Sequence, residues 1–232
     1  MIASLLLVAL AAPPDPIAGA ELLPADKRWA AVAGCVRVSG GGDRGPVAAA
    51  ACVGYKDGHA YLLTANHVVR KGEGRLYEFY TEKSYPKADR SAVGEDVLVS
   101  LPDEDVALVQ VKVEGNPTVL PLAGPGERPK RFPFPAVSVG CPVGETPLTR
   151  AERVEAKRLA RRPDGAVAFF WELAERPVGG MSGGPLLDAK GRVIGVCSAA
   201  KPDGPGYFAH HDEILAGLKR NGYSWLIPAA ER

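Results

Sequence analysis

Residues 178–187 read VGGMSGGPLL, so Ser182 lies between two pairs of glycines. Glycine adopts backbone angles that a Cβ forbids and lets a second strand approach closely. Such a backbone can present the serine hydroxyl and aim main-chain N–H groups at a developing oxyanion. The sequence Gly183-Gly184-Pro185 also excludes a regular helix after the serine. Taken alone, the stretch fits a nucleophilic serine and a plain surface turn equally well.

The rest of the composition is typical of many short strands. The 232 residues are 46% hydrophobic and 24% charged, with 27 glycines and 21 prolines, which suits tight turns. Lys and Arg number 28 against 27 Asp and Glu, and the net charge of +1 gives no basic field to hold a nucleic acid. The length fits one domain or two small, tightly packed ones.

Apolar runs between turn residues predict two successive sets of strands. The first set is expected at 31–38, 47–53, 60–64, 76–80, 96–101 and 105–113. The second set is expected at 136–140, 167–173, 185–187, 192–198 and 207–210. A stretch rich in Pro, Gly and basic residues at 122–134 predicts a linker between them, and 212–221 has helical spacing and ends at Gly222.

Conflicting signals meet at 150–162, which reads RAERVEAKRLARR. Its residues are good helix formers. The turn signal Arg162-Pro163-Asp164-Gly165 nevertheless leads directly into VAFFWEL, a clear strand. We expect a hairpin in which tertiary contacts override helix propensity, with a solvated charged helix as the alternative.

The N-terminus resembles an export signal. Residues 4–12 read SLLLVALAA, too short for a bilayer span of about 20 residues. Small residues at the spacing that signal peptidases read follow at Ala9-Leu10-Ala11 and at Ala18-Gly19-Ala20. We expect residues 1–20 to be a signal peptide removed after Ala11 or Ala20, giving a secreted, periplasmic or cell-surface protein without stable membrane insertion. A buried or membrane-retained N-terminal helix is the alternative.

Four cysteines allow three pairings, and an exported protein can form disulfides. Cys35 and Cys52 flank a Gly-rich turn at 39–46 and are expected on neighbouring strands, which makes that pair plausible. Cys141 and Cys197 are expected to be free and buried. The Cys and His spacing does not indicate zinc, so neither a metal nor a cofactor is expected.

A nucleophilic serine needs a neutral imidazole to accept its proton. His67 lies just beyond the end of the apolar strand 60–64 and is the best candidate among the four histidines. The alternative is that His67 is a core residue that only packs against the apolar strand. His210-His211-Asp212 could ligate a metal, but a strand end and helix N-cap is the commoner explanation.

Asp105 opens the apolar run DVALV at 105–109. A carboxylate that leads a buried strand needs a partner, and an imidazole N–H would be one that also fixes the tautomer of the base. Asp103 and Glu104 stand beside it, but only Asp105 abuts the apolar run. An acidic turn in water is the alternative.

In this order, TANHVV (64–69), DEDVALV (103–109) and GMSGGPLLD (180–188) resemble the three signatures of the trypsin/chymotrypsin-like serine proteases. The spacings of 38 residues from His67 to Asp105 and 77 from Asp105 to Ser182 resemble the bacterial HtrA-like branch. VSVGCPVG (137–144) and GRVIGV (191–196) also resemble that branch, and the likeness covers about residues 30–215.

The resemblance implies an all-β fold of two antiparallel six-stranded barrels with a short C-terminal helix. The N-terminal barrel, at 27–115, would carry His67 and Asp105. The C-terminal barrel, at 116–210, would carry Ser182, and a helix would follow at 211–226. The PDZ domain usual in HtrA-like proteins is not expected.

The resemblance also implies a serine endopeptidase that acts through an acyl-enzyme. Ser182 would attack the peptide carbonyl, His67 would act as general base and then acid, and Asp105 would orient His67. A catalytically silent binding or regulatory module with the same fold is the alternative. The G-x-S-x-G elbow of α/β-hydrolases fits less well, because in that family the acid and the histidine follow the serine.

The other site residues implied by the resemblance are main-chain groups. The N–H groups of Gly180 and Ser182 would form the oxyanion hole, and the strand Ser198-Ala199-Ala200 would pair with the substrate backbone. The expected partner is a polypeptide, with no nucleic acid, and the sequence does not indicate an oligomeric state.

Two positions depart from the digestive enzymes that the chain resembles. Met181 stands where they carry an aspartate that pairs with a newly cut N-terminus, so activation by such a cut is not expected. Arg176 lies six residues before Ser182, where an arginine could favour acidic side chains. A surface-exposed Arg176 is the preferred interpretation.

Overall fold

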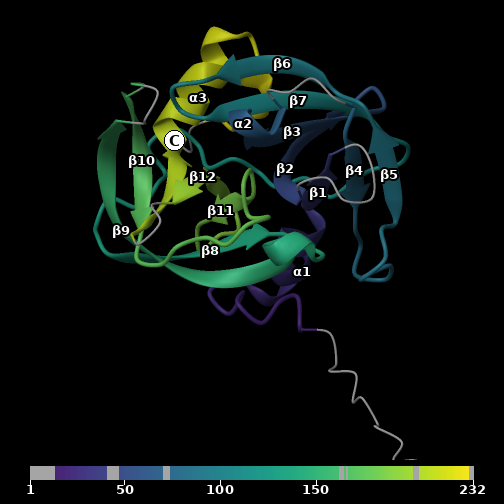
Figure 1. The fold of residues 1–232 in the computed structure, drawn as a ribbon, viewed down its shortest axis with the longest axis horizontal. Coiled ribbons are helices and arrows are strands. Elements are labelled where there is room, and N and C mark those ends of the chain that lie inside the picture. Colours follow the sequence, from purple (N-terminus) through teal and green to yellow (C-terminus); the bar gives the residue numbers. More distant parts are fainter. Residues whose placement is uncertain are drawn as a thin grey trace, which may run out of the picture.

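Two antiparallel sheets make up most of the molecule (Figure 1). The computed structural model describes residues 14–40, 47–69, 74–161, 165, 167–200 and 204–229. The predicted turns at 39–46 and 162–165 therefore lie mostly outside the described residues.

The first sheet has seven strands in the order β5-β4-β1-β2-β3-β7-β6. It is a curled, open sheet and not the closed six-stranded barrel that was expected, and the hairpin of β4 and β5 extends the edge at β1. Its strands are β1 (Cys35–Ser39), β2 (Val47–Lys56), β3 (His59–Ala65), β4 (Leu76–Phe79), β5 (Arg90–Val93), β6 (Asp96–Leu101) and β7 (Val106–Lys112).

The second sheet is the expected closed barrel of six strands in the order β10-β13-β12-β11-β8-β9. Its strands are β8 (Phe134–Gly140), β9 (Leu148–Arg161), β10 (Val167–Leu173), β11 (Pro185–Leu187), β12 (Val193–Ala200) and β13 (Gly206–His210). The helical segments are α1 (Ala25–Ala33), α2 (Asn66–Val69), η1 (Pro142–Gly144), α3 (His211–Arg220) and η2 (Ser224–Leu226).

The described part of the charged segment, residues 150–161, is a strand, as the hairpin prediction required. The second half of β9, from Val154 to Arg161, pairs with β10, with Trp171 opposite Lys157. Trp171 is fully buried in the barrel, and its indole N–H donates to the carbonyl of Ile194. Burial of this aromatic strand needs β9 beside it, so cross-strand packing outweighs the helix propensity of β9.

The structure corrects the N-terminal end of the first predicted strand. Residues 31–33 form the last turn of α1, and the strand begins only at Cys35. Pro24 precedes the helix, where its fixed φ is favourable, and the alanines that follow have high helix propensity.

The predicted C-terminal helix is confirmed as α3, which contacts β12 and β13 of the barrel and β6 of the first sheet (Figure 1).

The two sheets share one hydrophobic core. Leu63 and Leu108 of the first sheet pack in the same buried cluster as Val139, Leu187 and Val196 of the barrel. A shared core fixes the barrel against the end of β3, where His67 follows.

The predicted pairing of Cys35 with Cys52 is wrong. Cys35 lies opposite Ala51 in the β1–β2 ladder, so Cys52 points to the other face of the sheet. Cys35 belongs to the core shared by the two sheets, and Cys52 to a separate core of the first sheet. All four cysteines are free and buried, as was expected for Cys141 and Cys197.

Alkylation should therefore find Cys52 as an unreactive thiol in the native protein and a free one after unfolding. Burial raises the pKa of Cys52 to about 12, so little thiolate forms at pH 8. Iodoacetamide added in denaturant without reductant should modify Cys52 in full, as judged by peptide mapping against a reduced control. Recovery of a peptide cross-linked between Cys35 and Cys52 would contradict this arrangement.

Candidate active site

His67 and Asp105 are brought together by the pairing of two strands. β3 pairs with β7 so that Ala65 faces Val106, which places the residues just beyond these ends side by side. His67 Nδ1 lies 2.7 Å from Asp105 Oδ2, and the His67 main-chain N–H donates to Asp105 Oδ1 at 3.0 Å. The imidazole is 43% exposed, whereas the carboxylate is only 3% exposed. One end of the ring is thus anchored in the interior while the other is accessible.

The Asp105 carboxylate has a second donor. Ser198 on β12 donates its hydroxyl to Asp105 Oδ2 at 2.7 Å. Burial alone would raise the pKa of Asp105, but the hydrogen bonds from His67 and Ser198 outweigh it and hold the pKa below its ordinary value. Asp105 is therefore ionised at neutral pH and binds both sheets together.

Asp105 is distinguished clearly from its acidic neighbours. Asp103 is exposed. Glu104 faces Arg220 of α3 at 3.9 Å, and burial raises the pKa of its carboxyl. Asp105 also has φ +56°, an uncommon backbone conformation that Asp tolerates better than most residues. The backbone thus turns this carboxylate inward, as its place before the apolar run predicts.

The turn that carries Ser182 lies against the first sheet. The carbonyl of Ser182 accepts a hydrogen bond from the Ala49 N–H at 2.8 Å. A Cβ on Gly183 would come within 2.2 Å of Thr64 Oγ1 and 3.0 Å of the Ala65 nitrogen, so only glycine allows this close approach. The serine is consequently held next to the end of β3, from which His67 follows.

The structure joins two of the three predicted catalytic side chains directly and the third only by proximity of the backbone. Across the residues that are described, no hydrogen bond connects the Ser182 hydroxyl with the His67 imidazole. Catalytic hydrogen bonds are often long or poorly aligned before substrate binds, so the lack of this bond is compatible with a nucleophilic Ser182.

Gly180 has a conformation open only to glycine. Its φ is +93°, and a Cβ there would lie 1.9 Å from the Cys141 carbonyl oxygen. The preceding Gly179 carbonyl accepts the Val143 N–H at 2.8 Å. In a trans peptide the N–H points away from the C=O, so the Gly180 N–H faces away from Val143. Within the described chain, neither this N–H nor that of Ser182 donates a hydrogen bond.

The end of β12 offers an edge of main chain. β11 pairs with β12 only as far as Val196, whereas β13 continues along the other side to Ala200. Ser198 falls at a bulge in that ladder, and Ala199 is exposed. The placement suits an extended peptide added beside Ser198–Ala200.

The contact of the Ser198 hydroxyl with Asp105 was not anticipated, because Ser198 was singled out only for its main chain. The signal was present in the sequence: a serine ends the apolar strand 193–197, and a buried hydroxyl needs a partner. That partner lies 93 residues away in the chain, so only the fold could identify it.

The remaining candidates have structural roles. His210 caps α3, with its Nδ1 accepting the Asp212 N–H at 3.1 Å, which confirms the N-cap interpretation. The part of the chain that the structure covers contains no cluster of His, Cys, Asp or Glu suited to a metal ion. Met181 is buried in the barrel core, and Arg176 is exposed as expected.

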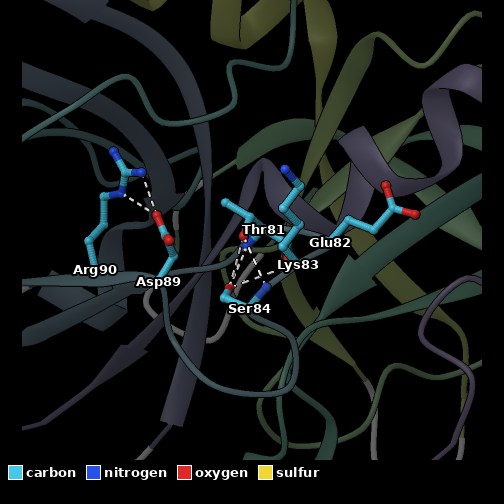
Figure 2. Close-up of a pocket in the computed structure, with 6 residues that line it drawn as sticks. All are labelled: Thr81, Glu82, Lys83, Ser84, Asp89 and Arg90. Carbon is cyan, nitrogen blue, oxygen red and sulfur yellow. Dashed lines mark hydrogen bonds and ion pairs between the residues drawn. The ribbon is translucent and has the colours of Figure 1, made fainter.

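A hollow of about 620 Å³ lies away from these residues, in the connection between β4 and β5. Figure 2 shows that it is lined by a short turn and a charged pair, in which Arg90 contacts Asp89 and Thr81 contacts Ser84. None of the predicted site residues lines it, so its location does not support a role as the active site.

A match to the family described as trypsin-like peptidase domain covers residues 48–196. This chain belongs to the trypsin-like peptidase family. The matched region includes the end of β3, the start of β7 and the Ser182 turn, on which the three predicted catalytic residues lie.

Named proteins of similar sequence come from bacteria. A probable periplasmic serine endoprotease DegP-like from Ectopseudomonas mendocina (strain ymp) is 32% identical over 139 residues, which is 60% of this chain and 27% of the relative. A second, from Pseudomonas fulva (strain 12-X), is 31% identical over 166 residues, or 70% of this chain and 32% of the relative. The chain thus spans about a third or less of the length of these relatives.

A solved structure supports the fold. Rv3671c from M. tuberculosis H37Rv, in an inactive form, superposes with a TM-score of 0.68 at 21% identity. The superposition covers 94% of this chain and 98% of that one. The trypsin-like fold predicted from the motifs is confirmed.

Removal of the Ser198 hydroxyl should destabilise the protein in a pH-dependent way. Ser198→Ala takes a hydrogen bond from a buried carboxylate, which costs about 2 kcal/mol of unfolding free energy at pH 7. Because the folded pKa of Asp105 is lowered, its stabilising effect is present above the unfolded pKa and is lost as the pH falls through the folded value. Urea unfolding should show the deficit shrinking in acid, whereas Ser91→Ala, at an exposed position of β5, should show no deficit. A deficit that stays constant as the pH falls through the folded pKa of Asp105 would contradict this role.

Proposed function

We propose that the protein is a serine endopeptidase that cleaves peptide bonds through Ser182, His67 and Asp105. The observation that carries this proposal is the ionised, buried Asp105, which binds the His67 ring within a trypsin-like fold. The position of the Ser182 turn against the end of β3 supports it. Because the relatives are much longer than this chain, the activity is inferred from the site itself and not from their names.

The pairing with Asp105 prepares His67 to act as a base. An ionised carboxylate only accepts hydrogen bonds, so Nδ1 of the neutral imidazole carries the proton. Nε2 is then left with its lone pair and can take the proton of the Ser182 hydroxyl. The buried negative charge also stabilises the imidazolium that this transfer creates.

Acylation of Ser182 then follows in two steps. Ser182 Oγ bonds to the peptide carbonyl carbon as its proton moves to His67 Nε2, and the carbonyl oxygen becomes an oxyanion. The N–H groups of Gly180 and Ser182 would stabilise that charge. The C–N bond breaks as Nε2 returns its proton to the leaving amine, and water repeats the sequence to release the acyl group.

The substrate proposed is a polypeptide in extended conformation. The edge at Ser198–Ala200 would pair with the residues before the scissile bond, as an added strand. Main-chain pairing of this kind gives affinity without demanding particular side chains.

Labelling by a fluorophosphonate probe tests the proposal. The wild-type protein should form a covalent adduct, and Ser182→Ala should form none because the nucleophile is gone. His67→Ala should stay folded by circular dichroism and label at least about 10²-fold more slowly, since the base is lost. Mass spectrometry of the adduct gives the site and the rate.

The same experiment tests the alternative that the protein is a catalytically silent binding or regulatory module. That alternative draws support from the lack of a Ser182–His67 hydrogen bond among the described contacts. A well-folded wild type that does not label would favour the module over the enzyme. Labelling of His67→Ala at the wild-type rate would contradict the assignment of the base.

We further propose that the protein is exported. The signal peptide expected at residues 1–20 is supported by relatives named as periplasmic, although residues 1–13 lie outside the described part. Among the residues that the structure describes, no helix is both long and apolar enough to traverse a bilayer.

The packing of residues 14–20 favours cleavage after Ala11. The Pro16 carbonyl accepts the Thr149 N–H at 2.9 Å, and the Gly19 N–H donates to Thr149 Oγ1 at 3.1 Å. Ala20 is fully buried in the core shared by the sheets. A cut after Ala20 would remove these contacts from the folded protein.

The intact mass of the exported protein should therefore correspond to a chain that begins at Ala12. An Ala11→Arg variant, which spoils that cleavage motif, should accumulate as the precursor, whereas Ala18→Arg should be processed normally. A mature chain that begins at Glu21 would contradict this placement.

A further inference from the structure

The turn beside the Ser182 loop is strained. Within η1, Val143 has φ +54° and Gly144 has φ +87°. A β-branched residue in the left-handed region is a genuine outlier that costs of order 1–3 kcal/mol unless its surroundings hold it. Val143 is 86% exposed, so side-chain packing does not hold this residue in place. Its conformation must come from hydrogen bonds made to its main-chain groups.

This strained turn orients the peptides before Ser182. The Val143 N–H donates to the Gly179 carbonyl at 2.8 Å, and the Cys141 N–H donates to the Gly180 carbonyl at 3.2 Å. Because η1 and Cys141 before it bind the carbonyls of Gly179 and Gly180, the Gly180 N–H points away from the turn. Loss of the turn's conformation would free the Gly179–Gly180 peptide to rotate.

One side chain from the other sheet holds the turn. Arg37 of β1 donates from Nε to the Gly144 carbonyl at 3.2 Å. Its guanidinium also pairs with Glu78, its direct cross-strand neighbour on β4. The two side chains are only 22% and 20% exposed, so each is restricted by the other. Arg37 is thus a fixed donor that reaches from the first sheet to the loop of the barrel.

A second contact reinforces the same link. Tyr85, in the connection between β4 and β5, shares a hydrogen bond of 2.7 Å with Thr146 Oγ1, two residues beyond the turn. The first sheet therefore holds both the turn and the segment that follows it.

We propose that Arg37 is a positioning residue for the oxyanion hole, which it keeps formed by holding the Gly144 carbonyl and, through η1, the Gly179–Gly180 peptide. The inference rests on the proposed function, because it concerns the Gly180 N–H in that reaction. Arg37 makes no contact with substrate. Its effect is on the fraction of molecules in which the donor points at the oxyanion.

A positioning role predicts a specific kinetic change. Removing an oxyanion donor outright typically costs 10²–10³ in kcat, so Arg37→Met should lower kcat by roughly 10- to 100-fold. KM should stay within about two-fold, because the carbonyl of the ground state uses the hole less than the oxyanion does. The assay uses a fluorogenic peptide chosen by cleavage of a peptide library with the wild-type protein.

A transition-state analogue separates this role from general destabilisation. A boronic acid of the same peptide sequence should bind Arg37→Met more weakly by the same factor as kcat. The matched control is Arg158→Met, which removes an arginine paired with Glu172 on the barrel without contact to the turn. It should leave kcat, KM and boronate affinity unchanged.

Arg37→Met leaves Glu78 without its partner and could unfold the sheet. The double variant Arg37→Met/Glu78→Met removes both charges and should show the same loss of kcat while melting near the wild type. Full kcat in a folded double variant, or equal losses in kcat and in substrate affinity, would overturn the proposal. A wild type that fails to label with fluorophosphonate would instead overturn the proposed function, so the two failures are distinct.

Discussion

A carboxylate that is withdrawn from water must be compensated, and Asp105 is compensated from two directions. The His67 ring approaches from the end of β3, and the Ser198 hydroxyl approaches from β12 of the barrel. These bonds overcome the cost of burial and keep the group ionised. One charge thereby fixes the tautomer of a histidine and binds the barrel to the first sheet. If Asp105 were neutral, neither contact would have its present strength.

The site is a product of the join between the sheets and belongs to neither alone. Their shared core sets the distance between β3 and the Ser182 turn. The glycines of that turn allow backbone contact where any larger residue would collide. Arg37 is another contact between the two sheets. Its side chain, on the first sheet, donates to the Gly144 carbonyl in a loop of the barrel. The geometry of a site between two sheets therefore depends on contacts, such as that of Arg37, that lie outside the site.

Local pattern was sufficient for most of the architecture. The turn signal at 162–165 and the aromatic strand after it identified β9 and β10 despite the helix-forming composition of 150–162. Local pattern failed where the partner is distant in sequence. The face to which Cys52 points depends on register, and the partner of the Ser198 hydroxyl depends on how the sheets meet. Helix α1 was missed because the apolar residues Ala31, Val32 and Ala33 extend a plausible strand backward from Cys35.

The most direct measurement is a crystal structure of the protein after reaction with a fluorophosphonate. The account predicts phosphorus bonded to Ser182 Oγ and His67 Nε2 within about 3 Å of an adduct oxygen. The phosphoryl oxygen should lie at the same distance from the N–H groups of Gly180 and Ser182, with Asp105 still bound to the far side of the ring. An adduct on another residue, or one whose oxygen lies beyond reach of these groups, would contradict the account.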